Sequence, residues 1–408
     1  MRILQITHQY PPHHIGGVEL LTRQLARDLA QRGHEVHVLT RAPGDHGDSI
    51  ENGVTIHRLP ATANPTRRFL ATFADAATLA ACNRILDDVR PDIVHIQHLM
   101  GYPLALIDAI RHRHIPYLVS LHDYWFACAN AQLITNFDQS ICAGPSHLKC
   151  SRCACARAGW SPFMSPAIAP VLAVRASRLK QVLCQAQQVV VNSHFVQDWF
   201  VRHNYAATNW SVMSYGLDHH LMTAIAPPIS TQTHPPTTFA YVGSLSWQKG
   251  VHVLIEAFNP MPRNATLTIA GDTEAFPEYV QQLRKQVQHP GIRFVGALDR
   301  AAVWQLLQHT DVVAVPALWH ETASLIAREA LATGCYVLAA EVGALSELIH
   351  RYPTCGRLLP PADVCAWRTA LHTLPALSRQ PQSFPSSRDY ASQFTTQYEN
   401  AVHATRTP

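Results

Sequence analysis

Long hydrophobic runs are missing from this chain of 408 residues. No segment approaches the roughly 18 consecutive apolar residues that a membrane-spanning helix needs. The first residues also lack the apolar stretch and small-residue cleavage site of a secretion signal. We therefore expect a cytoplasmic protein, with peripheral contact at the inner face of the cell membrane left open. In that compartment the ten cysteines are reduced thiols or metal ligands rather than disulfides.

Charge is scarce as well, because only 15% of the residues are Asp, Glu, Lys or Arg and the formal net charge is +4. So weak a positive balance gives no reason to expect a nucleic-acid partner. Hydrophobic residues make up 47% of the chain, which is enough for large cores and argues against disorder. One core rarely serves more than about 300 residues, so we expect two domains. Lysine is rare, and any lysine at a motif is therefore notable.

Short apolar runs rich in β-branched residues alternate with helical patterns along the chain. The runs are Ile3–Thr7, Val36–Thr40, Val54–Leu59, Ile93–Gln97, Tyr117–Leu121 and Val189–Asn192, then Phe239–Val242, Thr266–Ala270, Arg293–Val295, Val312–Val315 and Tyr336–Ala340. Apolar runs without strict alternation suit strands buried on both faces of a parallel sheet. The sequence therefore predicts an α/β protein with two Rossmann-like doubly wound domains facing each other across a cleft.

A proline-rich segment over residues 222–238 interrupts this rhythm and predicts a linker. We expect one domain over residues 1–221, with a cysteine-rich insert at about 128–157, and a second domain over residues 239–382. The tail, residues 383–408, carries Tyr390, Phe394 and Tyr398 at i, i+4 and i+8. That spacing predicts an amphipathic helix, which would pack back on the first domain.

Two glycine-containing turns follow the first strand of each expected domain. Gly16 and Gly17 begin a helix, where glycine allows close approach of a ligand and free N–H groups favour an anion. The full G-x-G-x-x-G spacing of a dehydrogenase is absent. In the second domain, Gly243 and Ser244 precede Lys249, whose ammonium can reach a phosphate as a point charge. The alternative is an ordinary solvated lysine.

Two glutamates, Glu321 and Glu329, follow a buried strand and bracket the start of a helix. Eight helical residues would separate them by about 12 Å, which matches an extended ligand rather than one reacting atom. Carboxylates accept hydrogen bonds from vicinal hydroxyls, and the amides near Ser324 and Leu325 offer a phosphate cradle. Two ordinary glutamates on an exposed face are the alternative, although Ala323, Ile326 and Ala330 make this helix apolar.

Together these motifs resemble the retaining GT-B glycosyltransferases of the group 1 family, glycosyltransferase family 4. That family has an early Gly-Gly turn, a Gly-Arg-Leu-x-x-x-Lys-Gly turn and a Glu-x7-Glu element. The smaller landmarks also stand in the family's order: Pro91-Asp92-Ile93-Val94-His95, Leu121-His122-Asp123, Asn192-Ser193 and Tyr215-Gly216-Leu217-Asp218. The resemblance covers about residues 1–375. Two positions depart from it: Ser244 replaces the usual Arg, and Thr322-Ala323-Ser324 replaces Pro-Phe-Gly.

The resemblance implies a hexosyltransferase that moves a sugar from a nucleotide diphosphate sugar to a hydroxyl of a glycan or lipid-linked acceptor, in surface polysaccharide or lipopolysaccharide synthesis. The first domain would bind the acceptor and the second the donor. No metal cofactor would be needed, because Lys249 and a helix start would meet the charge of the leaving diphosphate. The catalytic residues would be His122, Lys249 and Glu321, with Glu321 holding the sugar and His122 lying near it. Glu329 would hold the ribose. Gly271, Asp272 and Leu298 would border the base.

Cysteines cluster in the insert: Cys128, Cys142, Cys150 and Cys153 lie close in sequence. The Cys150-x-x-Cys153 spacing is that of a zinc knuckle, so the four thiolates are a candidate structural zinc site, with free thiols as the alternative. Beyond them, Trp160, Phe163 and a basic helix suggest contact with a membrane surface, or else a helix packed on the domain.

The motifs are also compatible with other functions. A nucleotide-sugar epimerase or a phosphorylase would share the architecture, but an epimerase would alter the donor without an acceptor. A non-catalytic sugar-nucleotide-binding protein would fit the substitutions at Ser244 and Ala323. An NAD-dependent oxidoreductase fits least, since its glycine fingerprint is missing.

Overall fold

The computed structural model describes residues 1–13, 16–44, 46–207, 209–224 and 233–406. It divides into two compact units, one formed by Met1–Gly216 with Ser387–Pro408 and the other by Leu217–Ser386. Residues 217–221, which we expected in the first domain, therefore belong to the second unit. Of the expected linker, residues 225–232 lie outside the described residues.

The first unit is built on an eight-stranded sheet among its described residues, in the order β3-β4-β2-β1-β5-β6-β7-β8. The strands are β1 (Arg2–Ile6), β2 (Glu35–Ala42), β3 (Gly47–Glu51), β4 (Val54–Pro60), β5 (Ile93–Ile96), β6 (Tyr117–Leu121), β7 (Gln188–Val191) and β8 (Trp210–Val212). All neighbours pair in parallel except β3 and β4, which form an antiparallel edge. β5 and β6 are buried at every residue, as the uninterrupted apolar runs predicted.

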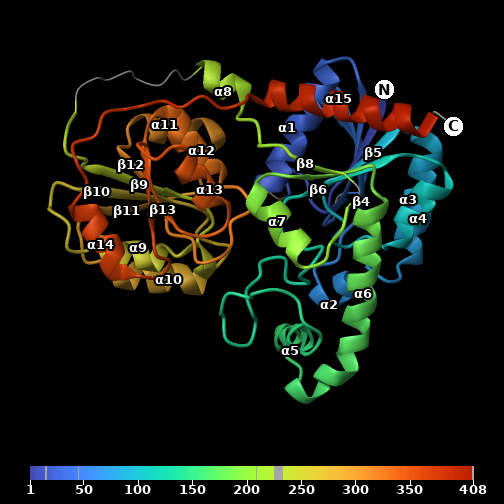
Figure 1. Cartoon of the computed structure of the whole chain (residues 1–408), viewed down its shortest axis with the longest axis horizontal. Coiled ribbons are helices and arrows are strands. Elements are labelled where there is room, and N and C mark those ends of the chain that lie inside the picture. The colour runs from blue at the N-terminus through green and yellow to red at the C-terminus, as the bar shows by residue number, and fades with distance from the viewer. Residues whose placement is uncertain (14–15, 45, 208, 225–232, 407–408) are drawn as a thin grey trace. The chain divides into compact units, whose positions relative to one another are not determined.

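Helices connect these strands and cover the sheet (Figure 1). They are α1 (Gly17–Gln31), α2 (Pro65–Leu70), α3 (Ala76–Val89), α4 (Ala105–His112), α5 (His147–Ala158), the 3-10 helix η1 (Pro162–Met164), α6 (Ser165–Gln185), α7 (His194–Arg202) and α15 (Ser387–Arg406). No helix in the described part of the chain is both long and apolar enough to cross a membrane.

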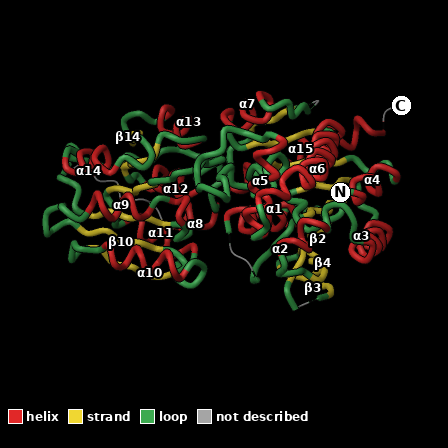
Figure 2. The backbone as a smooth tube through the Cα atoms, turned by 90° about the horizontal axis from the view of Figure 1, so that it is seen from below, coloured by secondary structure: helices red, strands yellow, loops and turns green. Residues whose placement is uncertain are grey.

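The second unit has a six-stranded sheet in its described part, all parallel, in the order β11-β10-β9-β12-β13-β14. Its strands are β9 (Thr238–Val242), β10 (Thr266–Ala270), β11 (Ile292–Gly296), β12 (Val312–Val315), β13 (Tyr336–Ala340) and β14 (Gly356–Leu359). Its helices are α8 (His219–Ala224), η2 (Trp247–Lys249), α9 (Val251–Phe258), α10 (Pro277–Gln286), α11 (Arg300–Gln308), α12 (Leu325–Thr333), α13 (Ala344–Arg351) and α14 (Val364–His372). Figure 2 shows strands between helices in each unit, which confirms the predicted pair of Rossmann-like folds.

Strand order in each sheet reverses beside the first strand of the unit. In the first unit the chain moves outward from β1 to β2 and returns to β5 on the other side, and in the second it moves outward from β9 and returns to β12. At such a switch point the two following loops leave in opposite directions and open a crevice at the carboxyl ends of the strands. The residues after β1 and β5, and those after β9 and β12, are therefore placed to meet a ligand.

The terminal helix α15 packs on the first unit, beside α1 (Figure 1). Tyr390, Phe394 and Tyr398, which repeat every fourth residue, are the aromatic side chains that it buries. The Tyr398 hydroxyl lies 2.6 Å from Nδ1 of His95, a residue of β5 without solvent exposure. Burial lowers the pKa of His95 to about 3, so its ring is neutral and Nδ1 accepts a hydrogen bond from the Tyr398 hydroxyl.

Tyr398→Phe is expected to reduce the free energy of unfolding by about 1 kcal/mol, because it removes one buried hydrogen bond and little packing. Urea denaturation followed by circular dichroism would measure the loss. Gln393→Ala, on the exposed side of α15, is the matched control. Equal stability of the Tyr398→Phe variant and the unmutated chain would contradict the assigned bond.

Candidate functional site

The turn that carries Lys249 is pressed against the chain that follows β12. Gly250 ends this turn with a φ of 70°, and a Cβ there would collide with the carbonyl oxygen of Pro316. The amide of Leu318 donates to the carbonyl oxygen of Gln248 at 2.8 Å. Only glycine fits a left-handed position so close to another backbone. The turn after β9 is thereby fixed against the segment that leads to Glu321.

Lys249 and Glu321 meet directly in the second unit. The Lys249 Nζ donates to Oε1 of Glu321 at 2.6 Å, and Nε1 of Trp319 donates to the same oxygen at 2.8 Å. The ammonium also lies 4.7 Å from the centre of the Trp319 ring. Glu321 is buried, whereas 26% of the Lys249 side chain is exposed. A fixed cation at the switch point is thus available to an anion arriving from solvent.

The backbone of Glu321 is held from the other side by the turn before α13. Gly343 has a φ of 57°, and a Cβ there would run into the backbone of Glu321. The amide of Ala344 donates to the carbonyl oxygen of Glu321 at 2.8 Å. Two glycine turns, at Gly250 and Gly343, therefore set the position of the Lys249–Glu321 pair.

Helix α12 begins later than the spacing of the two glutamates suggested. Ser324 is its N-cap, and the hydroxyl oxygen accepts from the amide of Ala327 at 3.3 Å. Because Leu325 is the first helical residue, only the stretch from there to Glu329 rises as a helix, by about 6 Å. Our expectation of about 12 Å of helix between the glutamates was wrong. The start of α12 still presents the positive end of the helix dipole beside Glu321.

Glu329 is buried and forms an ion pair with Arg300, the first residue of α11. Its side chain is 2% exposed and that of Arg300 is 34% exposed. Burial lowers the pKa of Arg300, and the nearby Asp218 opposes that shift. Arg300 was not among the residues predicted from the sequence motifs. The signal available was Asp299, which caps α11 by accepting from Ala302 and marks the next residue as the start of a helix at the carboxyl end of β11.

The other predicted donor residues of the second unit gather at the same edge of the sheet. Gly243, Gly271 and Leu298 follow β9, β10 and β11 respectively. A Cβ on Gly271 would collide with the carbonyl oxygen of Gly243, so the first two turns touch. Asp272 accepts from the amide of Glu274 at 2.8 Å and shapes its own turn. Ser244 is exposed, and its carbonyl oxygen accepts from the Tyr241 hydroxyl at 2.7 Å.

In the first unit, His122 sits at the carboxyl end of β6 inside a polar network. Its Nε2 lies 2.7 Å from Oε1 of Gln97, and its Nδ1 lies 2.6 Å from the Tyr215 hydroxyl. Nε2 therefore donates to Gln97, and Nδ1 accepts from Tyr215. Burial, aided by the charge of His98, lowers the pKa of His122 to about 4. The ring is neutral near pH 7, and both nitrogens are already engaged by protein groups.

The network around His122 extends to residues that no sequence motif indicated. Nε2 of Gln97 donates to Oε1 of Gln5 at 3.2 Å, which fixes the orientation of the amide. Beside it, His98 lies 3.2 Å from Asp123. Burial alone would raise the pKa of Asp123, but His98 and the amide of Trp125 hold it below its usual value. The carboxylate is therefore ionised, and the motif residues at the ends of β5 and β6 form one connected group.

Gly16 and Gly17 follow β1, as expected, and a carboxylate of α1 lies close to Gly16. A Cβ on Gly16 would meet Oε2 of Glu19 at 2.5 Å. Glu19 is buried and lies 3.8 Å from Nε2 of His8. In this structure the glycine thus makes room for a carboxylate of its own helix, while Gly16 and Gly17 themselves stay exposed.

The four candidate zinc ligands lie in the segment that contains α5. The sulfur of Cys153 accepts from the amide of Asn136 at 3.2 Å, and that of Cys150 accepts from the amide of Ser146 at 3.3 Å. Burial raises the pKa values of Cys128, Cys150 and Cys153. Within the described ranges, no three Cys, His, Asp or Glu side chains form a group that could hold a metal ion. The zinc site therefore stays a prediction from the spacing of Cys128, Cys142, Cys150 and Cys153.

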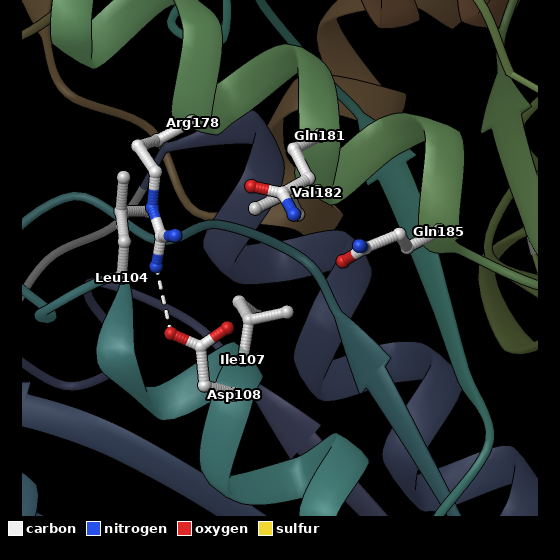
Figure 3. A pocket seen from close by; sticks show the side chains of 7 residues that line it. All are labelled: Leu104, Ile107, Asp108, Arg178, Gln181, Val182 and Gln185. Carbon is white, nitrogen blue, oxygen red and sulfur yellow. Dashed lines mark hydrogen bonds and ion pairs between the residues drawn. The ribbon is translucent and has the colours of Figure 1, made fainter.

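One small pocket lies away from these groups, between α4 and α6 (Figure 3). Arg178 donates to Oδ2 of Asp108 at 2.7 Å across it. Its lining residues are Leu104, Ile107, Asp108, Arg178, Gln181, Val182 and Gln185. It contains none of the predicted site residues, so we do not place the donor there.

Two doubly wound units, with a fixed ammonium and carboxylate at the switch point of the second, define the class of GT-B glycosyltransferases. The chain belongs to Glycosyltransferase Family 4, whose sequence profile matches residues 15–221. Residues 236–376 match the profile of the Glycosyl transferases group 1. The family that the motifs resembled is therefore confirmed, and with it a glycosyltransferase that uses a nucleotide sugar.

Known proteins similar to this chain agree with that family. A glycogen synthase of Mycobacterium tuberculosis is 26% identical over 400 residues, covering 92% of this chain and 86% of the relative. Sucrose-phosphate synthase from Thermosynechococcus elongatus has a similar fold, with a TM-score of 0.66 at 18% identity, over 99% of this chain and 96% of the other. HepE of Anabaena, solved in complex with UDP and glucose, has a TM-score of 0.64 at 18% identity, and the match covers 100% of this chain and 99% of HepE.

Proposed function

We propose that this glycosyltransferase moves a hexose from a nucleotide diphosphate sugar to a hydroxyl group of a glycan or lipid-linked acceptor, with retention at the anomeric carbon. The bond from that carbon to the diphosphate breaks, the bond to the acceptor oxygen forms on the same face, and a leaving-group oxygen takes the acceptor proton. The proposed setting is surface polysaccharide or lipopolysaccharide synthesis at the cytoplasmic face of the membrane.

The observation that carries the proposal is the contact of 2.6 Å between Lys249 and Glu321 beside the start of α12. Negative charge develops on the diphosphate as it leaves. A cation and helix amides that are already in place can stabilise this charge without reorganisation. In this role Lys249 and the amides near Ser324 and Leu325 meet the diphosphate, and no metal ion is needed for the leaving group. Glu321 then accepts hydrogen bonds from sugar hydroxyls.

The remaining groups take supporting roles in the proposal. Glu329, held by Arg300, accepts from ribose hydroxyls, and the turns at Gly243, Gly271 and Leu298 border the nucleotide. Ser244 supplies no charge, so Lys249 carries more of the diphosphate charge than in relatives with Arg there. His122 has a neutral ring with a fixed orientation. It belongs to the first unit, which binds the acceptor in this proposal. Since both of its nitrogens are engaged, His122 does not serve as an acid or base.

Retention is tested on the product itself. We expect thermal-shift screening of nucleotide sugars, beginning with UDP-glucose because HepE was solved with UDP and glucose, to identify a donor that raises the Tm. Proton NMR of the product from an α-linked donor should then show an α linkage. An inverted product would exclude retention. Conversion of the donor to another sugar nucleotide without any acceptor would instead favour an epimerase.

A further inference from the structure

The far end of α6 carries an exposed apolar surface. In Figure 1, α5 and η1 lie at the end of α6 that points away from the sheet of the first unit. Phe163 is 92% exposed and Leu148 65% exposed. We call this surface the apolar tip, and it consists of Leu148, Trp160, Phe163, Met164, Val171 and Val174.

The tip continues along one side of α6 as a regular stripe. Met164, Val171 and Val174 are spaced by seven and three residues, so they share one side of a helix. Leu172, Leu179 and Val182 of the same helix are buried in the first unit. A surface helix that buries one apolar side normally exposes polar residues on the other. Contiguous exposed apolar side chains mark a binding surface or a membrane contact.

The charge of this region is mostly positive. Residues 139–197 contain neither Asp nor Glu. Lys149, Arg152 and Arg157 lie on α5, within the tip region, and the described residues provide none of these three with an ion pair. Arg157 donates to the amide oxygen of Asn130, a neutral group. Asp138, just before this stretch, interacts electrostatically with Arg152. Lys149 and Arg157 remain as cations beside the apolar surface, and they complement an anionic lipid surface.

We propose that the apolar tip docks this protein on the surface of an anionic lipid bilayer, with Phe163 and Leu148 entering the headgroup boundary and the α5 cations facing lipid phosphates. Trp160 suits this depth, because an indole has an apolar body and a polar N–H. The docking does not depend on the transferase activity, since partition onto vesicles is measured without turnover.

The test is co-sedimentation of the full chain with vesicles of phosphatidylcholine, either alone or mixed with phosphatidylglycerol. We expect binding to the mixed vesicles only, weakened by salt. The double variant Phe163→Ser/Leu148→Ser should bind at least about tenfold more weakly. Each of the substitutions Lys149→Gln and Arg157→Gln should lower partition about fivefold. The control is Ile50→Ser, which removes an exposed apolar side chain from β3 in the same unit.

Three results would overturn the docking. The first is equal binding of the chain to both vesicle types. The second is unchanged vesicle binding of Phe163→Ser/Leu148→Ser. The third is a loss of vesicle binding in Ile50→Ser as large as that in the double variant. Light scattering after gel filtration provides a further check. If the unmutated chain is an oligomer that Phe163→Ser/Leu148→Ser converts to monomers, the tip joins copies of this chain and the lipid proposal fails. Donor binding by the variants shows that they are folded, and it separates this outcome from failure of the proposed transferase activity.

Discussion

Lys249→Ala is expected to lower kcat/KM for sugar transfer by about 10²–10³-fold, because removing one preorganised group that meets developing charge has an effect of this size. The loss should fall mainly on kcat if the ammonium acts as the diphosphate leaves. Lys249 also neutralises the buried Glu321, so the variant loses stability too. Steady-state kinetics should therefore be measured well below the Tm of the variant.

The matched control for Lys249→Ala is Lys285→Ala, which removes an exposed lysine from α10 in the same unit. Lys249→Arg keeps the charge and should recover part of the rate. If Lys249→Ala retained the rate of Lys285→Ala, the ammonium would have no role at the diphosphate, and the proposed mechanism would lose its main group.

Arg300→Ala is expected to reduce the free energy of unfolding by about 3 kcal/mol, because it leaves the buried carboxylate of Glu329 without a counter-charge. We take the lower end of the range because Arg300 is one-third exposed and partly screened. Urea unfolding followed by circular dichroism measures the change, with Arg263→Ala as the exposed control in the same unit.

A double-mutant cycle separates the ion pair from other effects of Arg300→Ala. The variant Arg300→Ala/Glu329→Gln should be more stable than Arg300→Ala alone, since the amide needs no counter-charge. If the loss of stability in the double variant equalled the sum of the losses in Arg300→Ala and Glu329→Gln, a direct ion pair would be contradicted. If Glu329→Gln bound the donor more weakly but unfolded at the same urea concentration as the unmutated chain, the proposed contact of Glu329 with the ribose would be supported.

The parallel sheets were predictable because their strands are buried on both faces. β5, β6 and β12 are short and uninterrupted in their apolar character, and the sequence marks them directly. β3 has no buried residue and is mostly exposed, and it was missed. β8 has no fully buried residue and was missed as well. Edge strands of this kind owe their pairing to neighbours distant in sequence, which no local pattern records.

The candidate site was predictable where a charged residue directly follows a strand that the sequence marks. Lys249 and Glu321 each follow a central strand, and parallel pairing brings the two turns together. The partner of Glu329 was not predictable, because Arg300 comes from another βα turn and lies 29 positions earlier in the chain. Likewise, nothing local to His122 indicates that Gln97 and Tyr215 engage both of its nitrogens.

Helix α15 makes the second unit an insertion within the first, since the chain leaves the first unit at Gly216 and rejoins it at Ser387. During synthesis, the ribosome completes the whole second unit before it produces the residues that cover His95 and β5. The second unit can thus finish folding first, against the usual order in which N-terminal domains precede C-terminal ones. The core of the first unit stays incomplete until Tyr398 has been synthesised.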